Sequence, residues 1–298
     1  MTARFGPSAE ARAFLADPSN RDTRRYNAEE LPALRAEQLA EAERVQPDLV
    51  ARHRVSLDWQ EIGDVPCLVI TPQEREGTAQ ILYLFGGAFI VGGPIEDLTL
   101  SAALAAQTGL QVISPAYALA PEHPFPVGLN NVLSVAETIR PSAIAGESAG
   151  GNFGLSVTRH LVGLGQAPDA LALLSPAADL TPDFDPFSAP DDPTLFPPFV
   201  AELTPAYAPG HDPFDDRISP LYGTFGPDWP STLITTGTRD LFLPQCAQLA
   251  RRMRACQVKT DLRVWDGLWH VFEYYDGIPE GAASLREIAH FLKENLHA

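Results

Sequence analysis

The residues best suited to chemistry lie in the segment 146–151, which reads Gly-Glu-Ser-Ala-Gly-Gly. The short apolar run 143–145 before it is typical of a buried strand, and the apolar spacing of 151–161 after it is typical of a helix. A Gly-x-Ser-x-Gly motif between a strand and a helix forms a turn so sharp that the serine hydroxyl is exposed at its tip. The segment therefore predicts that Ser148 is a nucleophile for acyl transfer, with a serine in a structural turn as the alternative.

A serine hydroxyl becomes a good nucleophile only when a base removes its proton, and the base needs an acid that holds it. When the serine lies in such a turn, the acid and then the histidine follow it along the chain. His270 comes soon after the last apolar run, 262–265, and Gly267 permits a tight turn between them. The other six histidines precede or immediately follow the serine motif, or fall in a proline-rich stretch or a C-terminal helical stretch. We therefore predict His270 as the base, with a structural turn histidine as the alternative.

His270 follows the last predicted strand, and the acid is expected in the loop after the strand before that one. An apolar run and a glycine lead directly to Asp240 at this place. Asp266 is too near His270 on the same loop, and Asp261 lies at the wrong end of its strand. We predict Asp240 as the orienting acid; the alternative is that it caps the helix expected over 244–257.

The negative oxygen that develops during acyl transfer needs backbone N–H donors. One is expected from Ala149, the residue after the nucleophile. Others are expected from the loop 85–89, which reads Phe-Gly-Gly-Ala-Phe after an apolar strand, because small residues let backbone amides approach a substrate carbonyl. The two glycines alone would also fit a simple tight turn, but together with the serine motif they indicate an oxyanion hole.

The elements that must position these residues alternate along the chain. Residues 8–50 have a helical pattern, and strand-like apolar runs alternate with helix-sized segments from residue 55 onward. The strand-like runs are 55–60, 67–71, 80–85, 112–114, 143–145, 171–175, 232–235 and 262–265, and the helical segments are 97–107, 127–139, 150–164, 244–257 and 281–296. This order predicts an α/β fold with a mainly parallel sheet that helices cover on both faces. In such a fold the site lies at the carboxyl ends of the strands.

One stretch, 179–231, breaks the alternation because it is dense in proline, aspartate and phenylalanine. Proline at this density prevents regular strands and long helices, while the phenylalanines favour burial. We predict a lid inserted here that packs with an N-terminal helical cap segment, residues 1–50, over a catalytic domain of residues 51–298; a disordered linker is the alternative. Bulky rings near the site predict a confined apolar pocket that prefers short acyl chains. They are Phe184, Phe187, Phe196, Phe199 and Trp269.

The formal net charge of −17 argues against nucleic acid or an anionic membrane as a partner. The three cysteines are an odd number at unrelated spacings, so neither a disulfide framework nor a metal site is indicated. The N-terminus lacks the apolar core of a signal peptide, and no apolar run approaches the ~18 residues that a membrane helix needs. We therefore expect a soluble, cytoplasmic protein without a cofactor or stable membrane association; its oligomeric state, including a homodimer, is left open.

Five motifs together resemble the hormone-sensitive-lipase-like family of α/β-hydrolase carboxylesterases, from about residue 65 to the C-terminus. They are Gly146–Gly151, Tyr117–Pro126 (Tyr-Ala-Leu-Ala-Pro-Glu-His-Pro-Phe-Pro), Ile218–Tyr222, Thr238–Asp240 and His270–Phe272. The resemblance implies an α/β-hydrolase fold with a cap or lid. It also implies a catalytic triad of Ser148, Asp240 and His270, the residues that the spacing indicates independently.

The same resemblance assigns the oxyanion donors to Gly87, Ala88 and Ala149, with Gly86 in a supporting place. Glu147 stands where many members of the family have aspartate. This position implies the same charge and a role in anchoring the loop.

One position departs from the family pattern. The family's His-Gly-Gly-Gly appears here as Phe85–Ala88, so a side chain that would help to fix the oxyanion loop is missing, whereas the main-chain donors remain. The resemblance implies a serine carboxylic-ester hydrolase that acts on a small-molecule ester through an acyl-enzyme. A lactone hydrolase and a non-catalytic binding protein of the same fold, the latter favoured only by Phe85, are the alternatives.

Overall fold

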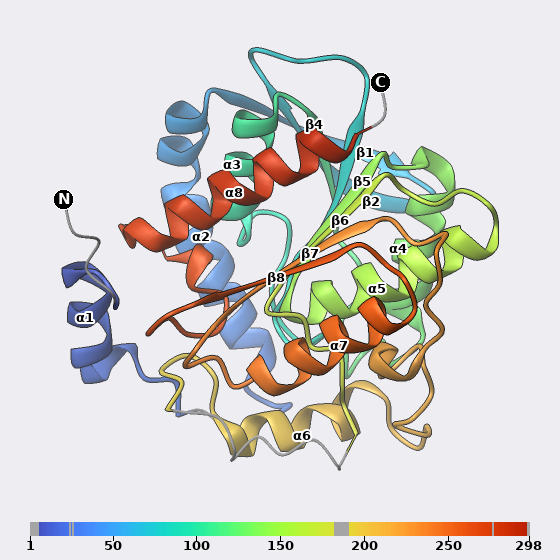
Figure 1. The fold of residues 1–298 in the computed structure, drawn as a ribbon. Helices are drawn as coiled ribbons and strands as arrows, with labels where there is room; N and C mark the ends of the chain where they lie inside the picture. The colour runs from blue at the N-terminus through green and yellow to red at the C-terminus, as the bar shows by residue number, and fades with distance from the viewer. Residues whose placement is uncertain (1–5, 24, 26, 182–190, 276, 297–298) are drawn as a thin grey trace.

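The computed structural model describes residues 6–23, 25, 27–181, 191–275 and 277–296. Their strands form one eight-stranded sheet in the order β1-β2-β4-β3-β5-β6-β7-β8, which runs through the centre of the molecule (Figure 1). The strands are β1 Val55–Ile62, β2 Val65–Pro72, β3 Gln80–Leu84, β4 Gln111–Pro115, β5 Ala143–Glu147, β6 Ala170–Leu174, β7 Ser231–Gly237 and β8 Thr260–Trp265. All neighbours from β4 to β8 in this order pair in parallel, whereas β2 is antiparallel to β1 and β4. The mainly parallel sheet expected from the sequence is confirmed.

The register of the parallel strands brings their carboxyl ends together. Leu84 at the end of β3 lies opposite Gly146 of β5, and Gly237 at the end of β7 lies opposite Trp265 of β8. The loops after β3, β5, β7 and β8 therefore leave the sheet at the same end. These loops carry the residues that the sequence predicts for the site.

Helices cover both faces of the sheet, as expected. One face is covered by α3 (Leu98–Thr108) and α8 (Pro279–Asn295), and the other by α4 (Val127–Ile139), α5 (Ser148–Gly163) and α7 (Leu243–Ala255) (Figure 1). Each agrees within a few residues with a helical segment expected from the sequence. The strands between these layers have apolar runs because both of their faces are buried.

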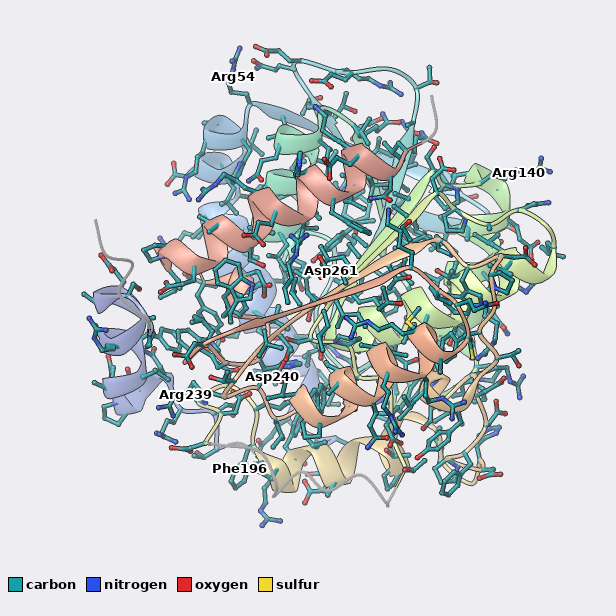
Figure 2. All side chains as sticks on the ribbon, in the orientation of Figure 1. Arg54, Arg140, Phe196, Arg239, Asp240 and Asp261 are labelled. Atoms are coloured by element: carbon teal, nitrogen blue, oxygen red, sulfur yellow. The ribbon has the colours of Figure 1, made fainter. Side chains whose placement is uncertain are left out.

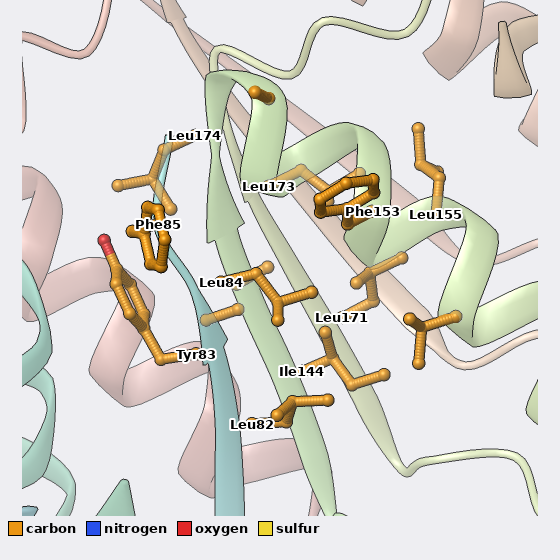
Figure 3. Packing of buried hydrophobic residues seen from close by; sticks show 14 of the residues in the cluster. Leu82, Tyr83, Leu84, Phe85, Ile144, Phe153, Leu155, Leu171, Leu173 and Leu174 are labelled. Atoms are coloured by element: carbon orange, nitrogen blue, oxygen red, sulfur yellow. The ribbon is translucent and has the colours of Figure 1, made fainter. Parts of the chain in front are cut away.

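The packing between the sheet and α5 fixes the start of that helix. Leu84, Ile144 and Leu171 of three adjacent strands and Phe153 of α5 belong to one buried hydrophobic cluster, and all four side chains are at most 1% exposed (Figure 3). Burial of a side chain of this size stabilises the folded state by about 1.5–3 kcal/mol. This packing holds the first residue of α5, Ser148, at a fixed place above the sheet.

The N-terminal residues form α1 (Ala9–Ala16), a short 3₁₀ helix η1 (Pro18–Asn20) and α2 (Leu31–His53). α2 packs on α3, and Phe14 of α1 stacks on Trp269 with ring centroids 4.3 Å apart. Whether these helices act as a cap on a catalytic domain stays a prediction.

The proline-rich stretch contains α6 (Pro197–Tyr207), which lies at the lower edge in Figure 1, and a short 3₁₀ helix, η3 (Pro220–Tyr222). A second short 3₁₀ helix, η4 (Phe272–Tyr274), follows β8. Two prolines, Pro197 and Pro198, occupy the first positions of α6, an 11-residue helix, where no backbone N–H is needed, and Pro205 lies inside its last turns. Phe184 and Phe187 lie outside the described residues, and the lid stays a prediction.

Candidate active site

Ser148 stands at a sharp turn between β5 and α5. Its φ of 49° is left-handed, a conformation that is uncommon for residues other than glycine and that stores strain at functional sites. The turn is tight because Gly150 has no side chain: a Cβ there would lie 2.0 Å from the carbonyl oxygen of Leu84. The strand, turn and helix expected around this serine are all present.

Three side chains from three loops form a continuous series of hydrogen bonds. The hydroxyl oxygen of Ser148 lies 2.9 Å from Nε2 of His270, and Nδ1 of His270 lies 3.0 Å from Oδ1 of Asp240. The serine follows β5, the aspartate follows β7 and the histidine follows β8. This arrangement lets an imidazole take a proton from a serine while a carboxylate stabilises the resulting charge.

Asp240 is fully buried, and its carboxylate also accepts hydrogen bonds from the Thr236 hydroxyl at 2.7 Å and the Phe242 amide at 2.8 Å. Burial alone would raise the pKa of Asp240, but the charge and hydrogen bond of His270, together with the hydrogen bond from Thr236, lower it. The carboxylate therefore stays ionised beside the imidazole. α7 begins at Leu243 with Phe242 as its N-cap residue, so Asp240 does not take the capping position.

The other acids considered from the sequence have different partners. Asp261 forms an ion pair with Arg263 at 2.8 Å, and it lies opposite Leu233, near the start of β7 (Figure 2 labels Asp240 and Asp261). Asp266 accepts a long hydrogen bond from the Thr238 hydroxyl at 3.4 Å. Among the described residues, only Asp240 has a carboxylate oxygen within hydrogen-bond distance of the imidazole of His270, the predicted base.

The imidazole of His270 is buried between the serine and the acid. Burial opposes protonation of the ring, but the charge and hydrogen bond of Asp240 outweigh it, and the pKa of His270 is raised above 6.5. This ring and that of Phe242 lie nearly perpendicular, at 83°, with the centroids 4.8 Å apart. A base held in this way keeps its proton to higher pH than a free imidazole does.

Asp192 is a residue near the base that sequence reasoning missed. Its Oδ2 accepts hydrogen bonds from two backbone amides, that of Leu241 at 3.1 Å and that of His270 at 3.2 Å. Its Oδ1 accepts from the amide and the hydroxyl of Thr194. Burial, and then the charge of Asp240, raise the pKa of Asp192 to about 6. One carboxylate of the proline-rich stretch thus joins the loop of the acid to the loop of the base.

Two of the residues predicted as oxyanion donors, Gly87 and Ala88, lie in the loop after β3. Gly87 and Ala88 both have positive φ, 100° and 58°, and both line the same cavity as Ser148. The carbonyl of Gly87 accepts hydrogen bonds from the amides of Ile90 and Val91, so the loop closes into a compact turn. A Cβ at Gly87 would lie 2.2 Å from the carbonyl oxygen of Val91, which explains the need for glycine.

Phe85, at the departure from the family pattern, packs rather than hydrogen-bonds. Its ring stacks on Tyr117 with centroids 4.0 Å apart, and the Tyr117 hydroxyl donates to the Phe85 carbonyl at 2.6 Å. Phe85 is 1% exposed. The tyrosine belongs to one of the motifs quoted from the sequence, but its contact with the oxyanion loop was not foreseen.

Glu147 lies under the same loop. The Gly86 amide donates to its carboxyl group, and a Cβ at Gly86 would lie only 1.9 Å from Oε1 of Glu147. Burial, and then the charge of Asp97, raise the pKa of Glu147 well above its ordinary value. The geometry agrees with loop anchoring, whereas burial opposes the charge that the resemblance implies.

α2 also reaches this loop. Nε of Arg35 donates to the carbonyl of Ile90 at 2.7 Å, and its Nη2 donates to the carbonyl of Ala120 at 2.7 Å. An ion pair with Glu122 at 2.9 Å orients the guanidinium. No motif marked Arg35, because its partners are backbone carbonyls far along the chain.

A cavity of about 620 Å³ opens onto Ser148 and His270. Phe199 lines it, but Phe196 and Trp269 are not among the described residues of its wall. The expectation that Trp269 narrows the pocket is wrong, because its ring stacks on Phe14 of α1 and is fully buried. The apolar part of the wall comes mainly from aliphatic side chains. They are Leu31, Leu34, Ile90, Val91, Leu195 and Val271.

A mainly parallel sheet with helices on both faces and a serine at a sharp strand–helix turn defines the α/β hydrolases. The family model for the alpha/beta hydrolase fold matches residues 81–274, and the chain belongs to the hormone-sensitive-lipase-like esterases of this fold. LipR of Mycobacterium tuberculosis is 31% identical over 249 residues, which cover 79% of this chain and 80% of that protein.

Two further relatives agree with this membership. An esterase of Acinetobacter venetianus is 29% identical over 230 residues, which cover 73% of this chain and 76% of that protein. A crystal structure of a hormone-sensitive lipase from a metagenome library has a TM-score of 0.86 and 28% identity, and the match covers 98% of this chain and all of that one. The chain is thus a carboxylesterase-type hydrolase.

Neither a metal-binding cluster nor a membrane-spanning helix is found among the described residues. No group of three or more histidine, cysteine or acidic side chains in the described ranges is placed to hold a metal ion. Among the helices of the same ranges, none has the length and apolar character to cross a membrane.

Proposed function

We propose that the chain is a serine carboxylic-ester hydrolase with Ser148 as nucleophile, His270 as base and Asp240 as the acid that orients the base. The observation that carries this proposal is the unbroken series of hydrogen bonds from the hydroxyl to the carboxylate, at 2.9 and 3.0 Å. Ser148 and His270 line a cavity of about 620 Å³, which is large enough for a small ester.

The first half of the reaction transfers the acyl group. As Oγ of Ser148 attacks the ester carbonyl carbon, Nε2 of His270 takes the hydroxyl proton. The electron pair of the C=O bond moves onto its oxygen, which the amides of Gly87, Ala88 and Ala149 stabilise. The carbon–oxygen bond to the alcohol then breaks, and the alcohol leaves with the proton from the imidazole.

The second half regenerates the enzyme. A water molecule gives a proton to Nε2 of His270 while its oxygen attacks the acyl carbon. The bond to Oγ of Ser148 breaks, and the serine recovers its proton from the imidazole as the carboxylic acid departs. The complete reaction consumes one ester and one water molecule and needs no cofactor.

Small or short-acyl esters are the proposed substrates. The cavity of about 620 Å³ lies in the range of sites for small molecules, and Phe199 and aliphatic residues supply its apolar wall. Hydrolysis rates of p-nitrophenyl esters from acetate to laurate test this range, and faster turnover of laurate than of butyrate would contradict it. A panel of lactones in the same assay tests the lactone alternative.

The serine mechanism is tested by burst kinetics. A p-nitrophenyl ester should release one equivalent of nitrophenol per enzyme before the steady state, because an acyl-enzyme accumulates. Ser148→Ala should remove the burst and lower kcat by about four orders of magnitude. If this variant kept more than a tenth of the activity, with its folding verified by circular dichroism, another nucleophile would be at work.

A further inference from the structure

A second cavity, of about 630 Å³, lies beside the first and shares part of its wall. Gly87, Val91 and Glu147 line both cavities. Because Glu147 directly precedes the proposed nucleophile and Gly87 is a proposed oxyanion donor, the two cavities meet at the reacting centre. A substrate bound there can extend into either one, and the mechanism above uses only the first.

The wall of the second cavity is acidic, and its described residues include no lysine or arginine. The carboxyl groups in this wall are those of Glu37, Glu41, Glu96, Asp97 and Glu147. Glu41 pairs with Arg44 on the surface. Within the described part of the chain, the other four have no ion pair with a basic side chain.

Asp97 is the most deeply placed of these acids. It is 5% exposed, and the hydroxyl of Tyr83 donates to its Oδ2. No described residue makes a hydrogen bond to its other carboxylate oxygen. A buried carboxyl group with an unused acceptor is unfavourable unless a partner arrives, and a cation is the partner that satisfies it best.

Two aromatic rings complete the wall. Tyr274 and Tyr275 line both cavities, and their rings meet edge to face with centroids 5.7 Å apart. The face of a tyrosine ring attracts an ammonium group, and such rings with carboxylates form binding sites for quaternary ammonium ligands. An anionic ligand would be repelled by the carboxylates of this wall.

We propose that the second cavity is a subsite for a positively charged group of the ester substrate, a quaternary or protonated amine. The inference rests on the proposed ester hydrolysis, since the cation binds in the second cavity while the ester carbonyl lies at Ser148. Asp97 and Glu96 supply the negative charge, and the two tyrosines supply the ring faces. Neutral esters of the same shape lack this contact.

The subsite also couples binding to pH. Burial raises the pKa of Asp97 to about 7, and a bound cation favours its ionised form. Binding of the cation therefore releases protons at or below neutral pH, and KM for a cationic ester should fall as pH rises from 6 to 8. KM for a neutral ester of the same shape lacks this dependence.

The first experiment compares two esters of nearly equal shape, acetylcholine and 3,3-dimethylbutyl acetate. We expect kcat/KM to be about tenfold higher for the cationic ester, the change that one good cation site supports. Asp97→Asn and Glu96→Gln should bring the ratio toward one. Glu61→Gln, which removes the same charge from the exposed edge strand β1, is the matched control and should leave the ratio unchanged.

The result that overturns the subsite is a ratio of one or less in the wild type, or a high ratio that both variants keep. Asp97→Asn removes a buried hydrogen-bond partner of Tyr83, so the thermal unfolding of this variant is compared with that of the wild type. Glu96 is only partly buried, so Glu96→Gln tests the charge of the subsite independently of folding. Hydrolysis of the neutral ester, and its loss in Ser148→Ala, reports on the proposed function alone.

A binding experiment separates the two proposals completely. Calorimetry with the Ser148→Ala protein measures the affinity for tetramethylammonium and for neopentyl alcohol, its neutral counterpart. Preferred binding of the cation, weakened at least about fivefold by Glu96→Gln, supports the subsite even if no ester is hydrolysed. Equal or undetectable binding of both compounds at millimolar concentrations overturns it even if the chain is an active esterase.

Discussion

Ser148, His270 and Asp240 are joined by hydrogen bonds between polar side chains, whereas the neighbouring loop with Gly87 and Ala88 combines hydrogen bonds to Glu147 and Arg35 with the stacking of Phe85 on Tyr117. The first region is a row of donors and acceptors at 2.9 and 3.0 Å. The second rests on stacked aromatic rings, on a buried acid whose pKa is raised and on an arginine from α2. The loop thus depends on packing as well as on hydrogen bonds.

The difference teaches where each region is sensitive. A hydrogen-bonded region loses its function when one polar atom is exchanged, even if its shape is kept. The loop is sensitive in addition to the loss of packed volume, because displacement of about 1 Å in a site can cost ~100-fold in rate. Substitutions of each kind therefore separate the two regions.

The largest effect is expected for Asp240→Asn. The amide keeps the volume but cannot stabilise the imidazolium of His270, so kcat should fall by about four orders of magnitude. Steady-state kinetics on p-nitrophenyl butyrate measure it. Asp266→Asn on the loop of the base is the control and should change kcat less than about twofold. A loss below tenfold for Asp240→Asn would show that this acid does not orient the base.

A smaller but large effect is expected for Phe85→Ala in the loop after β3. The lost ring frees Tyr117 and loosens the oxyanion loop, so kcat should fall up to about 100-fold with little change in the pH profile. Stability should fall by about 3–5 kcal/mol, measured by urea denaturation. Tyr117→Phe, which removes only the hydroxyl bonded to the Phe85 carbonyl, should cost less in both.

Phe85→His sharpens the same comparison by restoring the residue type of the family. If packing is sufficient to hold the loop, this variant should not exceed the wild-type kcat. A clear increase would mean that the wild-type loop is poorly held. Unchanged kcat in both the alanine and the histidine variant would show that position 85 does not control the oxyanion hole.

The pH dependence of the wild type probes the hydrogen-bonded region. His270 must be neutral to act as base, and its pKa is raised above 6.5, so kcat/KM should fall about tenfold per pH unit below a midpoint that lies above 6.5. The sign follows from the raised pKa, because protonation persists to higher pH. A midpoint below 6 in a pH profile with an uncharged ester would contradict it.

The smallest effect is expected for Asp192→Asn, which alters the link between the loops of Asp240 and His270. Its charge contributes to the raised pKa of His270, so the acid-side midpoint should move to lower pH. We also expect kcat to fall by about three- to tenfold, because the amide cannot accept all four hydrogen bonds. Asp191→Asn, at the exposed ion pair with Arg21, is the matched control. If the acid-side midpoint of the pH profile did not move, the charge of Asp192 would not influence His270, and its role would be limited to its hydrogen bonds.

Much of the fold could be predicted because its signals are local. Buried parallel strands need continuous apolar runs, and β5 and β6 are buried at every residue, as those runs indicate. The sharp turn at Ser148 needs glycine two residues on either side, which is visible as a motif. The order of serine, acid and histidine then selects Asp240 and His270 from many candidates.

The rest could not be predicted because it depends on contacts between distant segments. Asp192 belongs to a stretch whose composition suggested only a lid, and its four hydrogen bonds appear once two other loops lie beside it. Trp269 looked like a pocket residue because it precedes the base, yet α1 covers it with Phe14. Neither contact has a signal in the spacing of residues.

The sequence by itself thus determined which elements form and which polar side chains reach the carboxyl ends of the strands, because strand burial and tight turns impose residue types at fixed spacings. Only the tertiary structure decided how the environment tunes those groups: the raised pKa of His270, the raised pKa of Glu147 and the acidic wall beside the site. The physical reason is that burial and Coulomb interactions depend on distances in space, which pairs of residues far apart along the chain acquire only on folding.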